Sequence, residues 1–308
     1  MSLVTVIIAT YNRADTIGRA IKSVLEQSYE PIELIVVDDG STDRTAEIVA
    51  SFGEKVRYIR QENRGPSAAR NTGLRYSNGD IICFLDSDDL WHRAMVAREV
   101  AMLEKLGEDV PCCICNAEFV GEAGGGSSSF DTAWLRPYHS QGLWLNVSEV
   151  LASRFVLFNQ TAAIRMNALK KAGGFDESLR VMEDYDLALR ISLMGHWGYI
   201  SDVLVTKYVD SKSSLTKEAQ EQQVKLYNSI CGIYKKTLLE NVIVSEKTCG
   251  CLKSSLRSFE RLGYAARLKA KRGYLGAVSG TVISYTQRKC NGVKRRMPSF
   301  AKMEVVPF

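Results

Sequence analysis

The chain has 308 residues and 45% of them are hydrophobic, enough for one large core, while its eight cysteines lack the density and spacing of a disulfide framework. The formal charge of +5 hides an asymmetry, because residues 249–308 hold 13 Lys or Arg and two Glu, a balance of 13 − 2 = +11, which leaves 5 − 11 = −6 for the other 248. No apolar run approaches the ~20 residues that cross a bilayer, and the strand-like start leaves no room for a signal peptide, so we expect a cytoplasmic protein.

Short apolar runs alternate with amphipathic segments along the first part of the chain. Strands are predicted at residues 4–9, 32–37, 56–59 and 81–85, and helices follow the first three of them, the third from about residue 67. Apolar strands that alternate with helices predict a mostly parallel sheet with helices on both faces, a Rossmann-like α/β fold. Ligands bind such sheets at the carboxyl ends of the strands, where the polar loops of this chain lie.

The character of the sequence changes near residue 215, beyond which apolar residues recur at helical spacing. We therefore predict an α/β domain at 1–215 and a helical, basic region at 216–308. The basic excess predicts contact with an anionic membrane on its inner face, or with a lipid-linked phosphate, and a solvated helix face explains it equally well. Nucleic acid is not expected as a partner, because the tyrosines among these charges are too widely spaced to stack on bases.

An acidic turn follows the second predicted strand. Asp38 and Asp39 stand at the strand end, where a carboxylate can accept hydrogen bonds from a nucleobase or a ribose, and Gly40 permits a tight turn. Capping of the next helix accounts for the same residues equally well. The loop at residues 10–12 after the first strand is ambiguous in the same way.

A second acidic turn, DSDD at 86–89, follows the fourth predicted strand. Its carboxylates Asp86 and Asp88, one residue apart, can face one site if a cation neutralises them. Mg²⁺ and Mn²⁺ bind through one or two carboxylates and complete their shell with phosphate oxygens and water. The alternative is the capping of a helix that begins near Trp91; we favour the metal site because the turn directly follows a strand.

A third acidic pair, Glu183 and Asp184, precedes apolar residues at helical spacing. Asp184 therefore lies near the start of a helix, where the helix dipole favours an ionised carboxylate that can act as a base. The alternative is an ordinary acidic first turn, which the pair taken alone favours.

Five segments in chain order carry a family resemblance: TVIIATYN, IELIVVDDGSTD, NRGPSAARNTG, GDIICFLDSDD and GGFDESLRVMEDYDLALR. Together they resemble the family 2 inverting glycosyltransferases of the GT-A fold, over about residues 4–205. The resemblance implies a nucleoside diphosphate sugar as donor, with uridine the preferred base, and a Mn²⁺ or Mg²⁺ ion. It also implies a carbohydrate or lipid-linked saccharide acceptor and a role in the synthesis of cell-surface polysaccharide or glycoconjugates.

Carried over position by position, the resemblance also implies roles for single residues. Asp86 and Asp88 match the Asp-x-Asp element that binds the metal and the ribose diphosphate. Asp184 matches the catalytic base, with Glu183 beside it on the acceptor side. The residues that line the nucleotide site, with Asp39 on the base, are Thr10, Tyr11, Asn12, Asp39 and Arg70.

The chain departs from the family pattern after its last predicted strand. Many relatives carry a Tyr-Arg…His segment there, whereas this chain reads YVDSK at 208–212, without the His. Lys207 or Lys212 can replace the missing charge. The departure also suggests a rival function, a nucleotide-sugar-binding or scaffold module without transfer activity.

Other enzyme classes fit the sequence poorly. The Gln-x-x-Arg-Trp element of processive relatives is absent, which favours one transfer per acceptor. A dinucleotide-dependent oxidoreductase needs glycines in the first loop and a serine hydrolase needs a G-x-S-x-G turn, and the chain has neither.

Overall fold

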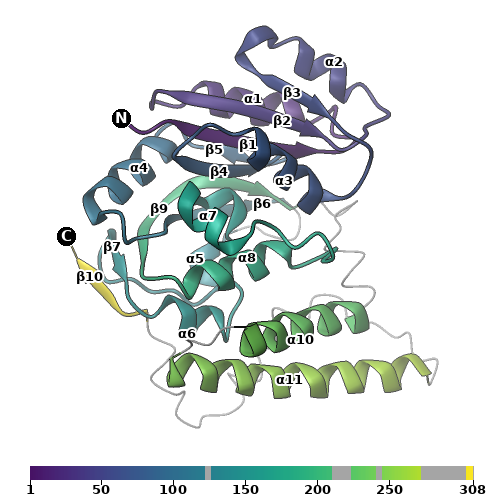
Figure 1. The fold of residues 1–308 in the computed structure, drawn as a ribbon, viewed down its shortest axis with the longest axis vertical. Helices are drawn as coiled ribbons and strands as arrows, with labels where there is room; N and C mark the ends of the chain where they lie inside the picture. The colour runs from purple at the N-terminus through teal and green to yellow at the C-terminus, as the bar shows by residue number, and fades with distance from the viewer. Residues whose placement is uncertain (122–125, 210–222, 241–244, 272–302, 308) are drawn as a thin grey trace.

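A computed structural model describes residues 1–121, 126–209, 223–240, 245–271 and 303–307 (Figure 1). The strands are β1 (Val4–Thr10), β2 (Ile32–Asp38), β3 (Arg57–Arg60), β4 (Ile81–Asp86), β5 (Leu90–Trp91), β6 (Cys112–Val120), β7 (Gln141–Trp144), β8 (Ala162–Arg165), β9 (Trp197–Tyr208) and β10 (Val305–Pro307). The helices are α1 (Ile17–Leu25), α2 (Thr45–Ala50), α3 (Pro66–Tyr76), α4 (Met95–Leu106), α5 (Ser129–Thr132), α6 (Val147–Leu151), α7 (Met166–Ala172), α8 (Glu183–Ser192), α10 (Gln223–Glu240) and α11 (Glu246–Lys271). Short 3-10 turns are η1 (Gly53–Lys55) and η2 (Asn159–Thr161).

One mixed sheet organises the described part of the chain. Its strand order is β10-β7-β9-β6-β8-β4-β1-β2-β3, and β5 pairs with β9. The strands β3, β2, β1 and β4 are parallel neighbours, and β6, β9 and β10 run in the same direction, while β5, β7 and β8 are reversed. The predicted mostly parallel α/β fold is therefore confirmed.

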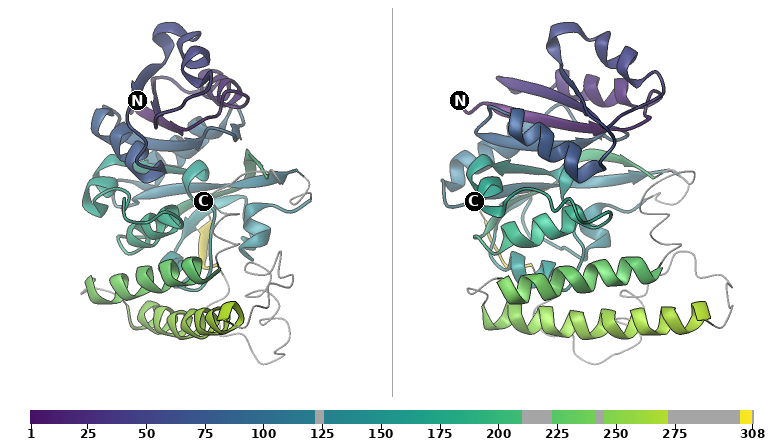
Figure 2. Two further views of the ribbon diagram at one scale, coloured as in Figure 1. Left: turned by 90° about the vertical axis from the view of Figure 1, so that its right-hand side faces the viewer. Right: turned by 45° about the vertical axis from the view of Figure 1, so that its right-hand side comes forward.

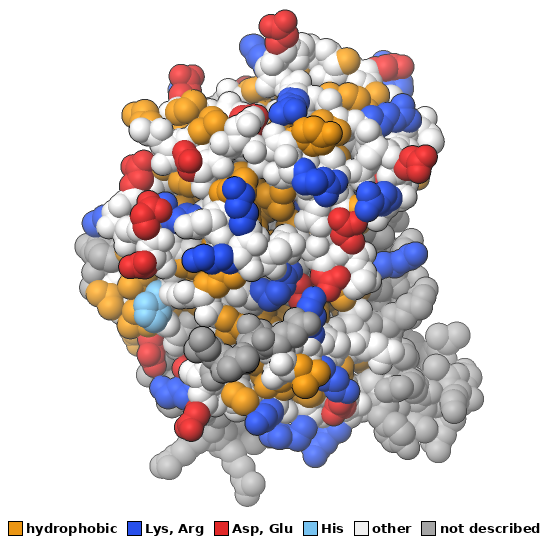
Figure 3. Space-filling view, viewed as in Figure 1, with side chains coloured by type: hydrophobic (Ala, Val, Ile, Leu, Met, Phe, Trp, Pro, Cys, Tyr) orange, Lys and Arg blue, Asp and Glu red, His pale blue; other side chains and the backbone are white. Residues whose placement is uncertain are grey.

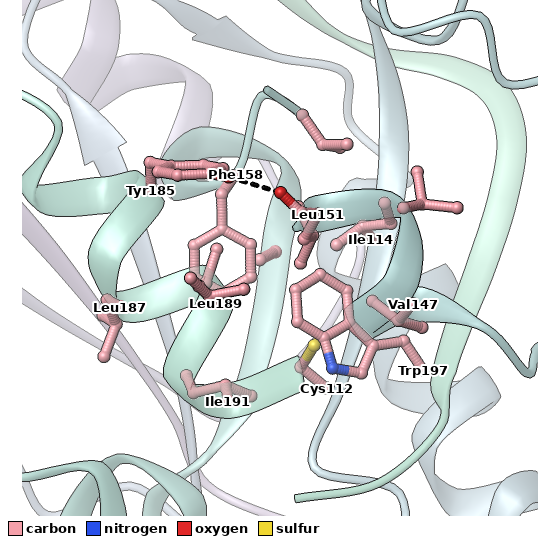
Figure 4. Packing of buried hydrophobic residues seen from close by; sticks show 14 of the residues in the cluster. Cys112, Ile114, Val147, Leu151, Phe158, Tyr185, Leu187, Leu189, Ile191 and Trp197 are labelled. Atoms are coloured by element: carbon pink, nitrogen blue, oxygen red, sulfur yellow. Dashed lines mark hydrogen bonds between the residues drawn. The ribbon is translucent and has the colours of Figure 1, made fainter. Parts of the chain in front are cut away.

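Helices cover both faces of the sheet (Figure 1). Since alternate residues of each strand point to opposite faces, each strand contributes side chains to the core on either side. On β1, Ile7 joins the cluster that α6, α7 and α8 cover, whereas Ile8 joins the cluster that α1 and α4 cover. Figure 4 shows part of the first cluster, which contains Leu189 of α8 and the rings of Phe158 and Trp197, with centroids 5.2 Å apart. The central strands β1 and β4 are mostly apolar because neither of their faces meets water.

The predicted helical C-terminal region is present as α10 and α11, which lie side by side at the foot of the molecule (Figures 1 and 2). Both helices join the same core as α8, through buried apolar side chains of α10 and through Leu252 of α11. The predicted boundary at residue 215 lies outside the described residues. None of the described helices is long and apolar enough to cross a membrane.

The chain returns to the sheet near its C-terminus. Met303 is buried, and β10 pairs antiparallel with β7, with Val305 opposite Trp144. The predicted region at 216–308 was helical, and this strand was not foreseen. Two adjacent valines are too short a run to produce a periodic signal, so this strand depends on the sheet edge that receives it.

The helix α4 carries a buried acidic residue. Glu99 is fully buried, neither of its carboxyl oxygens makes a well-formed hydrogen bond, and the thiol of Cys115 lies beside it. Burial raises the pKa of Glu99 well above the ordinary 4.5, so the folded protein holds this carboxyl in its neutral form. Because the unfolded chain loses the proton near pH 4.5, the stability that the raised pKa contributes is complete below that pH. It is lost as the pH rises through the folded pKa.

We therefore expect Glu99→Met to raise the free energy of unfolding at pH 8 by about 1 to 3 kcal/mol, the typical cost of a buried polar group without a partner. The gain should shrink as the pH falls below the ordinary pKa of 4.5, where both states keep the proton. Urea titrations at several pH values measure it. Glu104→Met, on an exposed position of the same helix, is the control and should change little. A gain independent of pH would contradict the neutral carboxyl.

Candidate active site

Two of the three predicted acidic motifs lie at one edge of the sheet, together with the loop after β1. In the register of the parallel strands, Thr10 at the end of β1 lies opposite Asp38 at the end of β2, and Ala9 lies opposite Asp86 at the end of β4. The carboxyl ends of these three neighbouring strands carry the loops at 10–12, 38–41 and 86–89. The sheet therefore does what the alternating pattern predicts, and places separate loops side by side.

The loop after β1 is tied to the loop after β2. Asn12 has a φ of 50°, a left-handed conformation that Asn tolerates better than most residues. Its backbone N–H donates to Ser41 Oγ at 2.9 Å, and its side-chain oxygen accepts from the Thr42 N–H at 2.8 Å. Tyr11, next to it, is 46% exposed, and the buried hydroxyl of Thr10 has no hydrogen-bond partner in the described residues. An exposed ring and a free hydroxyl thus stand at the strand end.

The Asp39 carboxylate organises the loop between β3 and α3. It accepts hydrogen bonds from the Gln61 side chain at 2.7 Å and from the backbone N–H groups of Arg64 at 3.0 Å and Gly65 at 2.7 Å. Only 3% of Asp39 is exposed. It does not cap α2, since Asp43 makes the contact with the first residue of that helix. The predicted contact between Asp39 and a base stays a prediction.

Arg70 joins the end of β4 to the start of α8. Its helix, α3, packs so closely on β1 that a Cβ at Gly73 would lie 2.4 Å from Ile7 Cγ2, a contact that only glycine avoids. The guanidinium is buried and donates to Asp86 Oδ1 at 2.9 Å and to Glu183 Oε1 at 2.8 Å. Burial lowers the pKa of Arg70, but the charges of Asp86 and Glu183 outweigh it and the pKa is raised. One fixed cation therefore bridges two of the predicted motifs.

A second cation, Lys207, lies at the end of β9. Its Nζ is 3.0 Å from Asp89 Oδ2 and 3.5 Å from Asp86 Oδ2. Asp89, fully buried, also accepts from Gln160 Nε2 at 2.7 Å and from the Tyr208 N–H at 3.0 Å. Burial lowers the pKa of Lys207, and the nearby carboxylates of Asp89 and Asp86 more than reverse this, so the ammonium stays charged.

The DSDD turn does not cap a helix. Leu90 and Trp91 form β5, which pairs antiparallel with β9, and α4 begins only at Met95 without a side-chain cap. The alternative in which this turn caps a helix near Trp91 is therefore wrong. The cause is the pairing with β9, a contact more than 100 residues away along the chain that local periodicity does not report.

Asp184 lies in the first turn of α8, as predicted. Its carboxylate accepts the Tyr185 N–H at 2.8 Å. Burial raises the pKa of Asp184, the charge of Glu183 adds to the rise and Arg70 opposes it, and the resulting pKa is about 7. A carboxylate with a pKa near neutrality can take a proton from a substrate hydroxyl and release it again to water.

Comparisons with known proteins identify the family of the chain. Residues 5–168 match the sequence profile described as Glycosyl transferase family 2. The chain is also 30% identical over 267 residues to an uncharacterized glycosyltransferase of Rickettsia typhi, a match that covers 85% of this chain and 81% of the relative. The chain belongs to glycosyl transferase family 2. A shorter stretch of 89 residues, 28% of this glycosyltransferase, is 46% identical to part of the glycosyltransferase GlyA of Streptococcus pneumoniae, covering 13% of that protein.

Solved structures share the fold of this glycosyltransferase. Residues 1–349 of S. aureus TarS, in complex with UDP-GlcNAc, align with a TM-score of 0.68 and 21% identity over 83% of this chain and 72% of that one. The mannosyltransferase PcManGT from Pyrobaculum calidifontis, in complex with GDP-Man and Mn²⁺, aligns with a TM-score of 0.61 and 21% identity, covering 95% and 81% of the two chains. The GT-A fold expected from the resemblance is confirmed.

The carboxylates of the glycosyltransferase fit a divalent cation that is completed by phosphate. Both oxygens of Asp86 are engaged by Arg70 and Lys207, which outweigh its burial and lower its pKa. Asp88 keeps a side chain that is 38% exposed, with Arg13 at 3.7 Å, and its pKa is raised by burial and by Asp86. No group of three or more His, Cys, Asp or Glu in the described ranges could hold a metal by itself. The site thus offers one accessible carboxylate and one engaged neighbour, the arrangement in which Mg²⁺ or Mn²⁺ takes its other ligands from a diphosphate and water.

Sequence reasoning missed part of this site. Asp89 belongs to the quoted DSDD turn, but nothing in the sequence separates its structural contacts from those of Asp88. Gln160 comes from η2 and carries no motif. Lys207 was one of two candidates for the missing charge; the other, Lys212, lies outside the described residues.

Proposed function

We propose that this glycosyltransferase moves a sugar from a nucleoside diphosphate sugar, with UDP as the preferred nucleotide, to a hydroxyl group of a carbohydrate or lipid-linked saccharide, with inversion at the anomeric carbon. The observation that carries the proposal is the bridge from Asp86 through Arg70 to Glu183, which brings the donor-side and acceptor-side carboxylates into one network. The fold shared with proteins that bind UDP-GlcNAc and GDP-Man supports the donor class.

The proposed reaction is a single displacement. Asp184 takes the proton of the acceptor hydroxyl while the oxygen forms a bond to the anomeric carbon, and the bond from that carbon to the diphosphate oxygen breaks with its electron pair on the leaving group. Attack opposite the leaving group inverts the configuration. Asp88 and Asp86 would hold the divalent ion, which when bound stabilises charge on the diphosphate. Lys207 and Arg13 add positive charge on the same side of the site.

Thermal melting with and without ligands tests the donor site. We expect UDP-sugars with Mn²⁺ to raise the melting temperature, since a ligand at about 100 times its Kd adds about 2.7 kcal/mol to the folded state. EDTA or Asp88→Asn should remove most of the shift, and Asp202→Asn, in an exposed ion pair on β9, should leave it intact. No shift with any nucleotide would refute the donor site. A shift without donor hydrolysis or transfer would instead support the binding-module function.

We also propose that the protein works on the inner face of the membrane, in the synthesis of cell-surface polysaccharide or glycoconjugates. Lys253, Arg257 and Arg261 are exposed at four-residue intervals, along one face of α11. Figure 3 shows basic side chains gathered at the lower edge of the molecule, over α10 and α11. Each of these basic side chains adds about 1 kcal/mol of attraction to an anionic surface. We expect the protein to co-sediment with anionic vesicles at low salt. If it does not, the solvated helix face is favoured.

A further inference from the structure

The start of α8 lacks the usual local support. Met182, the residue before the helix, has a φ of 66°, a left-handed conformation that is strained for a long side chain, and its side chain caps no backbone N–H. Strained residues of this kind persist where the surroundings hold them in place. The helix start that carries Glu183 and Asp184 must therefore be fixed by contacts from other elements.

Two such contacts flank Asp184. Glu183, one residue before it, is held by Arg70 of α3, and Tyr185, one residue after it, is held in the core. Residues two apart in a helix point about 200° from each other, so the two anchors lie on opposite sides of α8. Asp184 stands between them, and its direction depends on both.

The anchor at Tyr185 includes a tyrosine of the C-terminal region. The Tyr185 hydroxyl donates to the Leu151 carbonyl, drawn as a dashed line in Figure 4, and lies 3.0 Å from the Tyr234 hydroxyl. A carbonyl can only accept, so the proton of Tyr185 goes to Leu151, and Tyr234 of α10 donates the second bond. The side chain of Ser255 on α11 lies beside the Tyr234 hydroxyl. One chain of hydrogen bonds therefore runs from α10 through α8 to the end of α6.

The hydrogen bonds of Tyr185 and Tyr234 are shielded from water. Tyr185 and Tyr234 are each only 2% exposed, and burial raises the pKa of Tyr185 well above its usual value and that of Tyr234 to about 12, so both phenols stay neutral donors. A donor left without its acceptor here cannot turn to water. The two rings also meet edge to face, with centroids 6.2 Å apart.

A second contact ties α10 to the segment before α8. Lys236 Nζ lies 2.7 Å from Asp176 Oδ2, and Asp176 also accepts the Ser178 N–H at 3.0 Å. Burial raises the pKa of Asp176, but these bonds outweigh it and lower the pKa to about 2. The helix α10 thus contacts the chain on both sides of Met182.

We infer that Tyr234 is a positioning residue: its hydroxyl orients Asp184 through Tyr185 and so makes α10 part of the active site. The inference rests on the proposed function, in which Asp184 is the base. It gives the C-terminal helices a catalytic purpose separate from any contact with a membrane.

The test is Tyr234→Phe, which keeps the ring and removes one hydroxyl. We expect kcat to fall about tenfold while the KM for the donor and the Kd for UDP change less than twofold. Hydrogen exchange of the amides at 180–188 should become faster. Tyr185→Phe combined with Tyr234→Phe should lose little more than the larger single effect, because both changes break the same chain.

The matched control is Ile230→Val, one turn earlier on the same buried face of α10, which loosens packing without breaking a hydrogen bond. It should leave kcat and the exchange at 180–188 unchanged. Parental kcat and exchange in Tyr234→Phe would overturn the inference. If Asp184→Asn transferred sugar normally in the same assay, or the parent transferred none, the proposed function would fail instead, and the exchange measurement would still decide whether Tyr234 holds α8.

Discussion

Asp184→Asn should lower kcat by about a thousandfold, within the range of 10²–10⁴ that a positioned general base supplies. The amide keeps the size of the side chain but cannot take a proton. The Kd for UDP with Mn²⁺ should change little, because Asp184 lies in the first turn of α8 and is separated from Asp86 by the Arg70 bridge. Single-turnover transfer and isothermal titration measure the two quantities.

The pH dependence of kcat/KM in the parent should also report the ionisation of Asp184. Since the pKa of Asp184 is raised to about 7 in the free protein, kcat/KM should rise about tenfold per pH unit up to that value and level off above it. The sign follows from the active form, because the base is protonated and idle below its pKa. Asp184→Asn should lack this limb. Transfer at the parental rate in this variant would mean that another group is the base.

The sequence predicted the parts of the site better than their connections. Asp86 and Asp184 stand where they were expected, after an apolar strand and at the start of a helix, because both signals are local. Arg70 was expected near the nucleotide, yet its bond to Glu183 joins residues 113 apart. That bond depends on how closely α3 packs on β1 at Gly73, and no pattern in the sequence reports such a distance.

The errors have the same origin. Trp91 was read as the start of a helix in one alternative, but its pairing with β9 makes it a strand. The strand β10 was not foreseen, because its three residues form a strand only against β7. The buried contacts of Asp89 with Gln160 and Lys207 likewise come from three distant segments. Local propensity decides the long elements, and tertiary pairing decides the short ones.

Arg70→Met should be the most damaging substitution to the fold of the site. Methionine fills a similar volume but leaves Glu183 without its cation and Asp86 with Lys207 alone. The side chains of Arg70, Glu183 and Asp86 are only 9%, 13% and 25% exposed. Breaking a buried ion pair by removing one partner costs about 3 to 5 kcal/mol. We expect a loss of this order in the free energy of unfolding from urea titration, and a fall in kcat of at least about a hundredfold as α8 loses an anchor beside Asp184.

The control for this change is Arg64→Met. Arg64 also forms an ion pair at 2.8 Å, with Glu177, but the two side chains are 57% and 34% exposed, and its backbone bond to Asp39 does not depend on the side chain. Such exposed pairs contribute about 0 to 1 kcal/mol. Since Arg70 opposes the rise in the pKa of Asp184, its removal should also move the acid limb of the pH profile upwards, and Arg64→Met should not. Equal losses of stability in the two variants would show that the Arg70 bridge is no stronger than a surface pair, and α8 would then have to be held mainly by the tyrosines.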